Sequence, residues 1–502
     1  MRTPRFKTVA LGILLLFACS CAVKNYNLAP EEVGRGAPGT PLLITLKDGT
    51  EARLRDVRLE QSKLIGITGN RQRREIDIAS IWAVQIRKRD YSLVAVGLGV
   101  AGVAAWLAIG ASTAPPPPPS ESCPFIYSFD GDQYVFDAEP YGGAICQGLE
   151  RTDWCGLEHL VESDGQYRIL ISNELNETEY TDELKLVVVD HPKGVQVVPD
   201  AAGRVHSFAQ PRPPLRAVQN GEKDILGLVS ARDLQVWESS YEDRSSPLKE
   251  ALREELIFEF AKPRDARKAK LLVHAAADFW GSQVAKGFLE LFGDKVSDWY
   301  SKVNSRGPEL QRLMSWYLRE ELYLLQVRVE TPNGWEPRGI IYGTGPFVSE
   351  DKAYVLDIGD IPGEILRIKL TPPTQFWDID YLAVDYSEDL PMDVMKISPS
   401  GTGSRTQPDV RELLQADDDR YFVLPKAGVS AEIIFPAPPR KPGLDRTIML
   451  GASGYYDIHL DAGGEPQTDL IETILAEPGS TLRYAMKIYE AGKRNDGEGS
   501  RR

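Results

Sequence analysis

An uncharged apolar run, YSLVAVGLGVAGVAAWLAIGAS at 91–112, constrains the folding of the chain more than any other feature. It has the length that a helix needs to span a membrane. Small residues spaced four apart along it, such as Ala95 and Gly99, suit close packing of helices within a membrane. Five prolines at 115–119 follow, and such runs form stiff polyproline II spacers. We therefore expect a membrane-type helix at 91–112 and a Pro-rich linker at 113–122, with separately folded parts on either side.

The N-terminus has the layout of a secretory signal peptide. Arg2, Arg5 and Lys7 precede the apolar stretch VALGILLLFA, which is too short to span a membrane comfortably. The segment LFAC at 16–19 resembles the lipobox of bacterial lipoproteins. The resemblance implies a signal peptide at 1–18 and lipidation of Cys19, which would anchor the protein in membrane lipid. Cys21 is a second choice for lipidation, and an ordinary signal peptide that happens to end in cysteines is the alternative.

Residues 19–40 have the Gly, Pro and polar composition of a tether, and 41–90 read as strands. Five short bursts of alternating apolar residues in 41–90 are separated by turn sequences such as KDGT. Five strands in so short a stretch predict a small β-barrel that resembles SH3-like or Sm-like folds. Basic residues near 71–74 and 87–89 suggest contact with anionic lipid, and a charged barrel surface is the alternative.

The two hydrophobic signals conflict over topology. A cleaved signal peptide leaves 22–90 outside the cytoplasm, so that a simple crossing at 92–111 would place the rest of the chain inside. The basic residues at 87–89 favour the opposite orientation. Three alternatives stay open: the segment lies against the membrane, crosses an outer membrane, or crosses the inner membrane against its flanking charges. We expect a bacterial cell-envelope location, with the outer membrane or periplasm favoured.

Charge is unevenly distributed along the chain. Residues 1–90 carry a net charge of +7 and residues 91–502 carry −22. An acidic body would repel phosphate groups at every contact, which argues against nucleic acid as a partner.

Beyond the linker the sequence alternates strand-like runs with turns rich in Gly and Pro. Nine such runs lie between 167 and 386, of which the first two, at 167–173 and 182–190, are strong. The other seven, between 254 and 386, are separated by Gly and Pro turns and predict an antiparallel β-sandwich of the jelly-roll type. Apolar residues with helical spacing predict a helical insert at 281–320, where Trp299 and Trp316 suit a packed core. The fold class we expect is mainly β with a helical insert. The expected body segments are a β-rich domain at 123–250, a sandwich at 251–390, an α+β unit or completion of the sandwich at 391–490, and a flexible tail at 491–502.

A cluster of carboxylates begins the body. Strand-like FIYSF and QYVFD flank a hairpin turn that contains Asp130 and Asp132, and Asp137 and Glu139 follow. These oxygens suit calcium, although the twelve-residue spacing of an EF-hand loop is absent and turns favour Asp for backbone reasons. We expect no other cofactor.

The stretch from Cys123 to Asp153, with YSFDGDQYVFDAEPYGGAI and LERTDW, resembles a segment found in bacterial envelope proteins that have no assigned reaction. The resemblance supports the domain layout and implies no activity. Cys146 and Cys155 lie nine residues apart around a turn-rich loop, which suits a disulfide in an oxidising compartment. Buried free thiols are the alternative.

No catalytic motif is present. The five histidines form no HExxH, and there is no G-x-S-x-G elbow and no P-loop. Trp335, in the turn PNGWEP, is the aromatic residue that we expect to be exposed for stacking on a sugar ring. We predict a non-catalytic envelope protein that binds or scaffolds an unknown protein or glycan. The alternatives are a carbohydrate-active enzyme that uses two body carboxylates, and a subunit of a membrane assembly that oligomerises through 91–112.

Overall fold

The computed structural model describes residues 24–28, 42–46, 51–60, 63–67, 73–77, 81–88, 124–233, 235–241, 252–402, 410–460 and 463–499. The chain divides into two compact units, one made of 1–109 with 232–235 and the other of 110–231 with 236–502. With 44% of residues in strands against 19% in helices, the protein is mainly β, as the sequence predicts. Cys19, Cys21 and the apolar segment 91–112 lie outside the described residues. Within those residues, no helix is both long and apolar enough to cross a membrane.

The first unit contains a six-stranded antiparallel sheet in the order β1-β6-β2-β3-β4-β5. Its strands are β1 (Lys24–Leu28), β2 (Leu42–Leu46), β3 (Glu51–Glu60), β4 (Lys63–Ile67), β5 (Arg73–Asp77) and β6 (Ile81–Lys88). All five strands predicted in 41–90 are present. The prediction of a plain tether at 19–40 is wrong in one part, because β1 pairs with β6. Tyr26 and Leu28 alternate with polar residues and lie opposite Ile86 and Val84, so this short segment also fits a strand.

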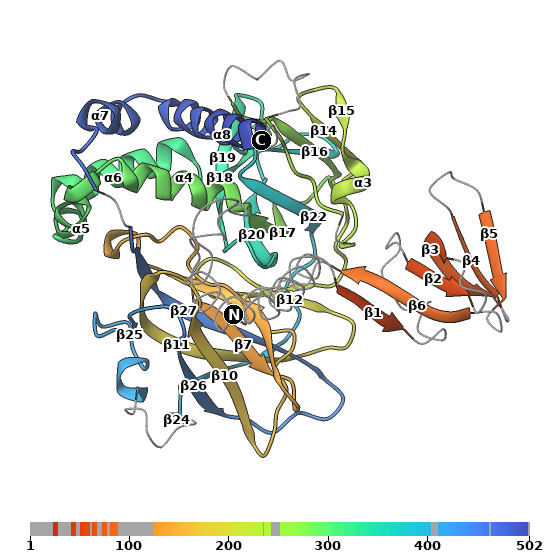
Figure 1. Ribbon diagram of the computed structural model, residues 1–502. Coiled ribbons are helices and arrows are strands. Elements are labelled where there is room, and N and C mark those ends of the chain that lie inside the picture. The colour runs from red at the N-terminus through yellow and green to blue at the C-terminus, as the bar shows by residue number, and fades with distance from the viewer. Residues whose placement is uncertain are drawn as a thin grey trace, which may run out of the picture. The chain divides into compact units, whose positions relative to one another are not determined.

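Two antiparallel sheets form one half of the body (Figure 1). The first, β24-β26-β10-β7-β8, consists of β7 (Phe125–Phe129), β8 (Tyr134–Ala138), β10 (Gln166–Asn173), β24 (Gly401–Thr402) and β26 (Val429–Pro436). The second, β23-β11-β27-β9 with β25 paired to β11, consists of β9 (Arg151–Gly156), β11 (Glu177–His191), β23 (Asp393–Ile397), β25 (Phe422–Leu424) and β27 (Asp445–Ile458). Tyr167, Ile169 and Ile171 of β10 alternate into the core, as the period of a strand requires.

The other half of the body is built on two more sheets and a hairpin (Figure 1). The sheet β15-β14-β16-β21-β18-β19 consists of β14 (Arg216–Gln219), β15 (Lys223–Asp224), β16 (Leu256–Ala261), β18 (Leu324–Thr331), β19 (Gly334–Tyr342) and β21 (Ile365–Leu370). The sheet β20-β17-β22 consists of β17 (Lys268–Ala277), β20 (Glu350–Asp357) and β22 (Trp377–Asp385), and β12 (Gln196–Pro199) pairs with β13 (Val205–Phe208). The nine runs predicted between 167 and 386 all correspond to strands.

The strand pairing corrects the predicted domain boundaries at 250/251 and 390/391. Strands β23, β25, β26 and β27, from the predicted C-terminal unit, each pair with β9, β10 or β11. Strand β14, from the predicted 123–250 domain, pairs with β16. The region after 391 therefore completes existing sheets, which is one of the two alternatives that the sequence left open.

Helices from two parts of the chain, 279–320 and 468–499, pack together on one side of the body (Figure 1). The predicted insert at 281–320 is confirmed as α4 (Phe279–Glu290), α5 (Val296–Asn304) and α6 (Pro308–Glu320). The remaining helical segments are α3 (Leu226–Val229), α7 (Thr468–Ala476), α8 (Ser480–Gly499) and the short 3-10 turns Gln147–Leu149, Gly293–Lys295 and Arg411–Leu413. The prediction of a flexible tail from 491 is wrong as far as Gly499, because α8 continues to that residue.

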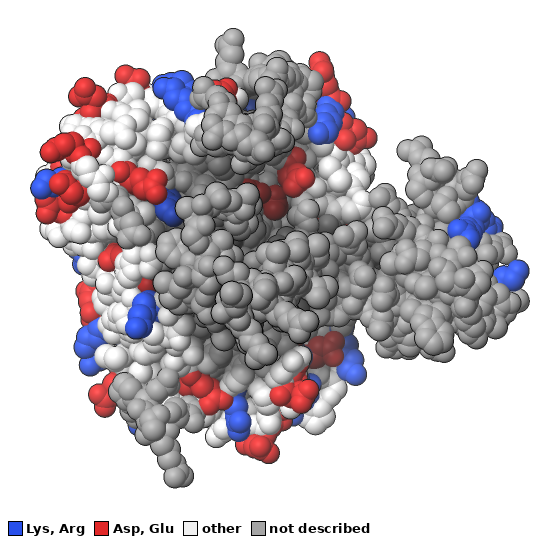
Figure 2. All heavy atoms as spheres, in the orientation of Figure 1, with Lys and Arg blue, Asp and Glu red and all other residues white. Residues whose placement is uncertain are grey.

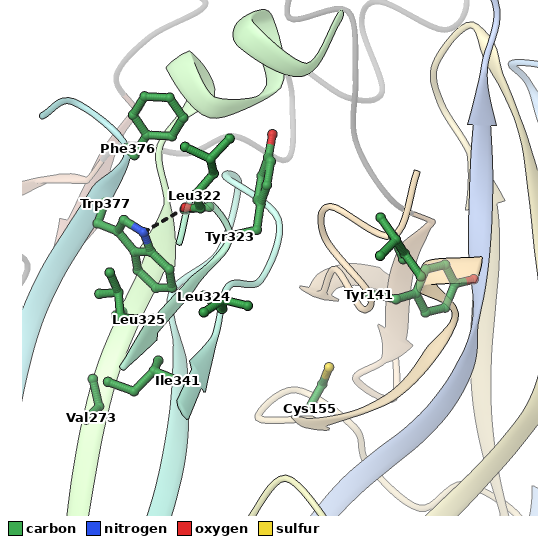
Figure 3. Packing of buried hydrophobic residues seen from close by; sticks show 14 of the residues in the cluster. Tyr141, Cys155, Val273, Leu322, Tyr323, Leu324, Leu325, Ile341, Phe376 and Trp377 are labelled. Atoms are coloured by element: carbon green, nitrogen blue, oxygen red, sulfur yellow. Dashed lines mark hydrogen bonds between the residues drawn. The ribbon is translucent and has the colours of Figure 1, made fainter. Parts of the chain in front are cut away.

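One large hydrophobic cluster joins the helices to the sheets. The ring of Trp316 in α6 stacks on Phe288 in α4 with centroids 5.1 Å apart, and Trp299 packs beside them, so both tryptophans are core residues as expected. Trp377 is buried between sheet residues, and its indole N–H donates to the Leu322 carbonyl at 3.0 Å (Figure 3). On the described part of the surface in Figure 2, acidic and basic side chains are mixed rather than gathered in one patch.

Candidate functional site

A pocket of about 360 Å³ lies where the edges of three sheets meet. Strands β9, β19 and β20 each end the strand order of their sheet, and β20 adjoins both of the others. Helix α6 closes one side. The lining residues are Gly148, Leu149, Glu150, Arg151, Thr152, Asp153, Trp154, Asp200, Ala201, Met314, Tyr317, Leu318, Leu324, Tyr342, Lys352 and Tyr354. Junctions between packed units are common places for ligand sites, because side chains from separate elements converge there.

Arg151 and Asp153 form an ion pair in the wall of the pocket. The Arg151 Nε atom lies 3.0 Å from Asp153 Oδ1, and the guanidinium also donates to the carbonyls of Gly142 and Gly343 at 2.6 and 2.9 Å. Asp153 accepts the backbone N–H of Tyr141 at 2.8 Å. Burial alone would raise the pKa of Asp153, but the charges of Arg151 and Lys352 hold this pKa below its usual value. Asp153 is therefore an ionised carboxylate.

Lys352 supplies a second cation on the neighbouring strand β20. Its Nζ atom donates to Glu350 Oε2 at 2.7 Å and to the Trp154 carbonyl at 3.0 Å. Burial alone would lower the pKa of Lys352, but the Glu350 carboxylate and the nearby Asp153 raise it. The Arg151 and Lys352 cations are thus balanced by the Asp153 and Glu350 carboxylates. Both cations also donate hydrogen bonds to backbone carbonyls beside the pocket.

The rest of the pocket surface is largely aromatic. The rings of Trp154, Tyr317, Tyr342 and Tyr354 line it, and the Arg151 guanidinium lies 5.7 Å from the centroid of the Tyr342 ring. Tyr317 is only 7% exposed, and its hydroxyl oxygen lies beside the Arg151 guanidinium. A guanidinium has donors only, and the hydroxyl proton has no acceptor among the described residues. Burial raises the pKa of Tyr317 to about 12, so this hydroxyl keeps its proton and has a donor to offer a ligand.

Glu150 stands at the border of the pocket in a different electrostatic state. It is half-buried, and its Oε2 atom accepts from the Tyr421 hydroxyl at 2.8 Å. Burial, and then repulsion from Asp182 and Asp417, raise the pKa of Glu150 to about 7 against the effect of the Tyr421 hydrogen bond. One pocket therefore holds an ionised carboxylate at Asp153 and a carboxyl that readily keeps its proton at Glu150.

The carboxylates that the sequence proposed for calcium do not come together as a ligand set among the described residues. Asp130 Oδ1 accepts the backbone N–H groups of Asp132 and Gln133, both at 2.9 Å, as turn geometry requires, and Asp132 is exposed. Asp137 is buried elsewhere and binds His159 Nδ1 at 2.9 Å. Glu139 accepts the N–H of Phe347 at 3.0 Å.

Trp335 is half-buried rather than exposed. The Lys369 ammonium lies 4.5 Å from the centroid of its ring, so a cation already occupies one face. This contact leaves less of the ring for stacking on a sugar than the turn sequence suggests.

Cys146 and Cys155 are free, buried thiols in the structure, which is the second of the two alternatives for this pair. The two thiols have different charged neighbours: Asp457 is near Cys146, whereas Glu350 and Lys352 are near Cys155. Burial raises the pKa of both thiols, that of Cys146 to about 12.

The sequence prediction missed Arg151, Asp153, Tyr317 and Lys352. The sequence did contain a signal for these charged residues. Arg151 and Asp153 lie two residues apart on one strand, and Glu350 and Lys352 do so on another. Residues two apart in a strand point to the same face of the sheet. Whether that face points inward depends on sheets brought together by distant parts of the chain.

No protein-family model matches the chain, and no curated protein matches it. A cryo-EM structure of the arabinofuranosyltransferase AftD from Mycobacteria is similar at 12% sequence identity, over 88% of this chain and 31% of that chain, with a TM-score of 0.18. The chain thus spans about a third of that protein.

Proposed function

We propose that the protein is a non-catalytic binding protein of the bacterial cell envelope, and that the pocket between β9, β19 and β20 binds a small glycan. The supporting observation is the combination of aromatic rings, balanced charges and the unused Tyr317 hydroxyl in this pocket. Sugars offer apolar ring faces to aromatic side chains and hydroxyls to polar groups. A pocket with paired charges suits an uncharged polar ligand better than an ion, because a charged ligand would have to break an existing pair.

The test uses the full chain in detergent, screened on a glycan array and then measured by calorimetry. Tyr317→Phe removes only the unused hydroxyl, and we expect it to weaken binding by about fivefold to tenfold, the value of one net hydrogen bond. Tyr386→Phe is the matched control, because its hydroxyl also lacks a partner but lies outside the pocket. The proposal fails if no glycan binds, or if both variants bind like the wild type.

A second candidate function, glycan cleavage, is favoured by the two states of Glu150 and Asp153. Glycosidases pair a protonated carboxyl with an ionised one, and environments that separate two pKa values in this way mark such roles. Turnover of a bound glycan that is lost in both Glu150→Gln and Asp153→Asn would establish this candidate. Binding without turnover would leave the non-catalytic proposal in place.

The proposed location depends on the N-terminal sequence. We infer that Cys19 is acylated and that 91–112 associates with the membrane. In the sequence, a small SH3-like or Sm-like barrel lies between these two segments, and a jelly-roll-type body follows them. The barrel is supported by β3, which pairs with both β2 and β4 and is irregular between Arg55 and Arg58, where a bend would close a sheet. The intact mass of protein extracted from native membranes tests the anchor. Loss of 1–18 with an added diacylglycerol and acyl mass supports it, and an unmodified N-terminus contradicts it.

A further inference from the structure

Three carboxylates gather beside the pocket. Glu150 precedes β9, Asp182 belongs to β11, and Asp417 follows the 3-10 turn at Arg411–Leu413. One oxygen from each lies within 4.8 Å of the others. We call these three residues the acidic cluster.

The fold brings the cluster together through a bulge in β11. Pairing with β27 is irregular between Thr181 and Glu183, so Asp182 is an extra residue whose side chain is redirected. The loop that carries Asp417 runs along the same stretch, because the Leu184 N–H donates to the Leu414 carbonyl at 3.0 Å.

Asp182 carries the second observation. Its side chain is fully buried, and its Oδ1 atom has no hydrogen-bond partner, while Oδ2 accepts the Asp419 N–H at 2.9 Å. The buried Oε1 atom of Glu150 also lacks a partner. Buried carboxylate oxygens without donors are costly unless a proton or a cation compensates their charge. Arg420, in the same loop, binds Asp418 at 2.7 Å instead.

We propose that the acidic cluster binds a calcium ion. Calcium takes carboxylate oxygens at 2.3–2.6 Å, so ligands on opposite sides of the ion lie up to about 5 Å apart, in agreement with the observed spread. Its coordination is flexible and accepts bidentate carboxylates, whereas magnesium demands a strict octahedron. This site replaces the calcium set of Asp130, Asp132 and Asp137 suggested by the sequence. The proposal does not depend on glycan binding, although an ion bound to Glu150 would fix one wall of the pocket.

The experiment titrates calcium into the full chain after removal of divalent ions with EDTA, followed by calorimetry. Terbium luminescence, excited through tyrosine, gives a second readout because the Tyr421 hydroxyl binds Glu150. We expect one site per chain, with affinity at least tenfold weaker in Asp417→Asn, whose exposed position makes misfolding an inadequate explanation. Asp182→Asn should have the same effect.

Asp418→Asn is the matched control, because this neighbouring carboxylate is exposed and paired with Arg420. We expect it to bind calcium like the wild type. Absence of binding at 1 mM calcium, or equal weakening in Asp417→Asn and Asp418→Asn, would overturn the proposal. Glycan binding that persists without calcium would leave the pocket proposal standing, so the two can fail separately.

Discussion

Gly451→Ala tests whether the wall of the pocket is as closely packed as the structure indicates. Gly451 in β27 lies directly opposite Trp154 in β9. A Cβ atom added at 451 would lie 2.5 Å from Cζ3 of the indole ring. The ring cannot easily yield, because Gly203 approaches it as closely and the Lys185 ammonium lies 5.2 Å from its centroid. The glycine is therefore required by the ring and not by its own backbone, whose φ is not positive.

The magnitude follows from two opposing effects. Overpacking a buried site costs about 1–3 kcal/mol, and replacing glycine by alanine within a strand returns about 0.5–1 kcal/mol. We expect a net loss of about 1–2 kcal/mol in the free energy of unfolding, or roughly 1–2.5 °C in the thermal midpoint of a body this large. Tryptophan emission should also shift, and glycan binding should weaken, because Trp154 lines the pocket.

Gly156→Ala is the control, since it lies in β9 with no atom within 4 Å of the added Cβ. We expect it to change stability by less than about 0.5 kcal/mol. In a Trp154→Phe background the smaller ring should relieve the clash, so that Gly451→Ala costs at least about 0.5 kcal/mol less than in the wild type. An equal cost in both backgrounds would refute the reasoning.

Three further predictions concern buried groups. Burial raises the pKa of Asp457 to about 7, so the folded state holds a proton that the unfolded state loses near pH 4; this group should lower stability from pH 4 to 7 by up to about 4 kcal/mol, and Asp457→Asn should reduce the fall in urea titrations to the part that Glu150 contributes. Arg446 forms a bidentate ion pair with Asp190, with both side chains 2% exposed; Arg446→Met should cost about 3–5 kcal/mol in urea unfolding at pH 7, and adding Asp190→Leu should recover most of it. Peptide mapping should show Cys146 and Cys155 unreactive towards an alkylating reagent until the protein unfolds, and rapid native labelling would contradict their burial.

Local structure was readable from the sequence because alternation reports which face of a strand is buried. The residues Tyr167, Ile169 and Ile171 are separated by one position each, and all three are buried. The insert was readable for the same reason at a helical period, with Val284 and Phe288 on one face of α4. Pairing partners were not readable, because alternation fixes a strand's face and not its neighbour. The pairing of β10 with β26, from opposite ends of the body, therefore escaped prediction.

The candidate site escaped prediction for a related reason. Charged residues in strands usually face solvent, and only the meeting of three sheet edges turns Arg151 and Lys352 inward. Asp130 and Trp335 attracted attention because turn residues are conspicuous in a sequence. In the structure, hydrogen bonds to the turn and a cation over the ring account for them.

The network around Arg151 also serves to join the sheets, so its presence alone does not distinguish a binding site from a structural joint. An unused buried hydroxyl costs about 1–3 kcal/mol, and Tyr386 outside the pocket has one as well, so the two roles are separated by measuring stability and binding together. Tyr317 retains such a hydroxyl in the pocket. If it is kept for a ligand, Tyr317→Phe should leave stability unchanged or raise it while weakening binding, the usual trade-off at a functional site. A variant that lost stability and binding together would instead show that the hydroxyl belongs to the joint.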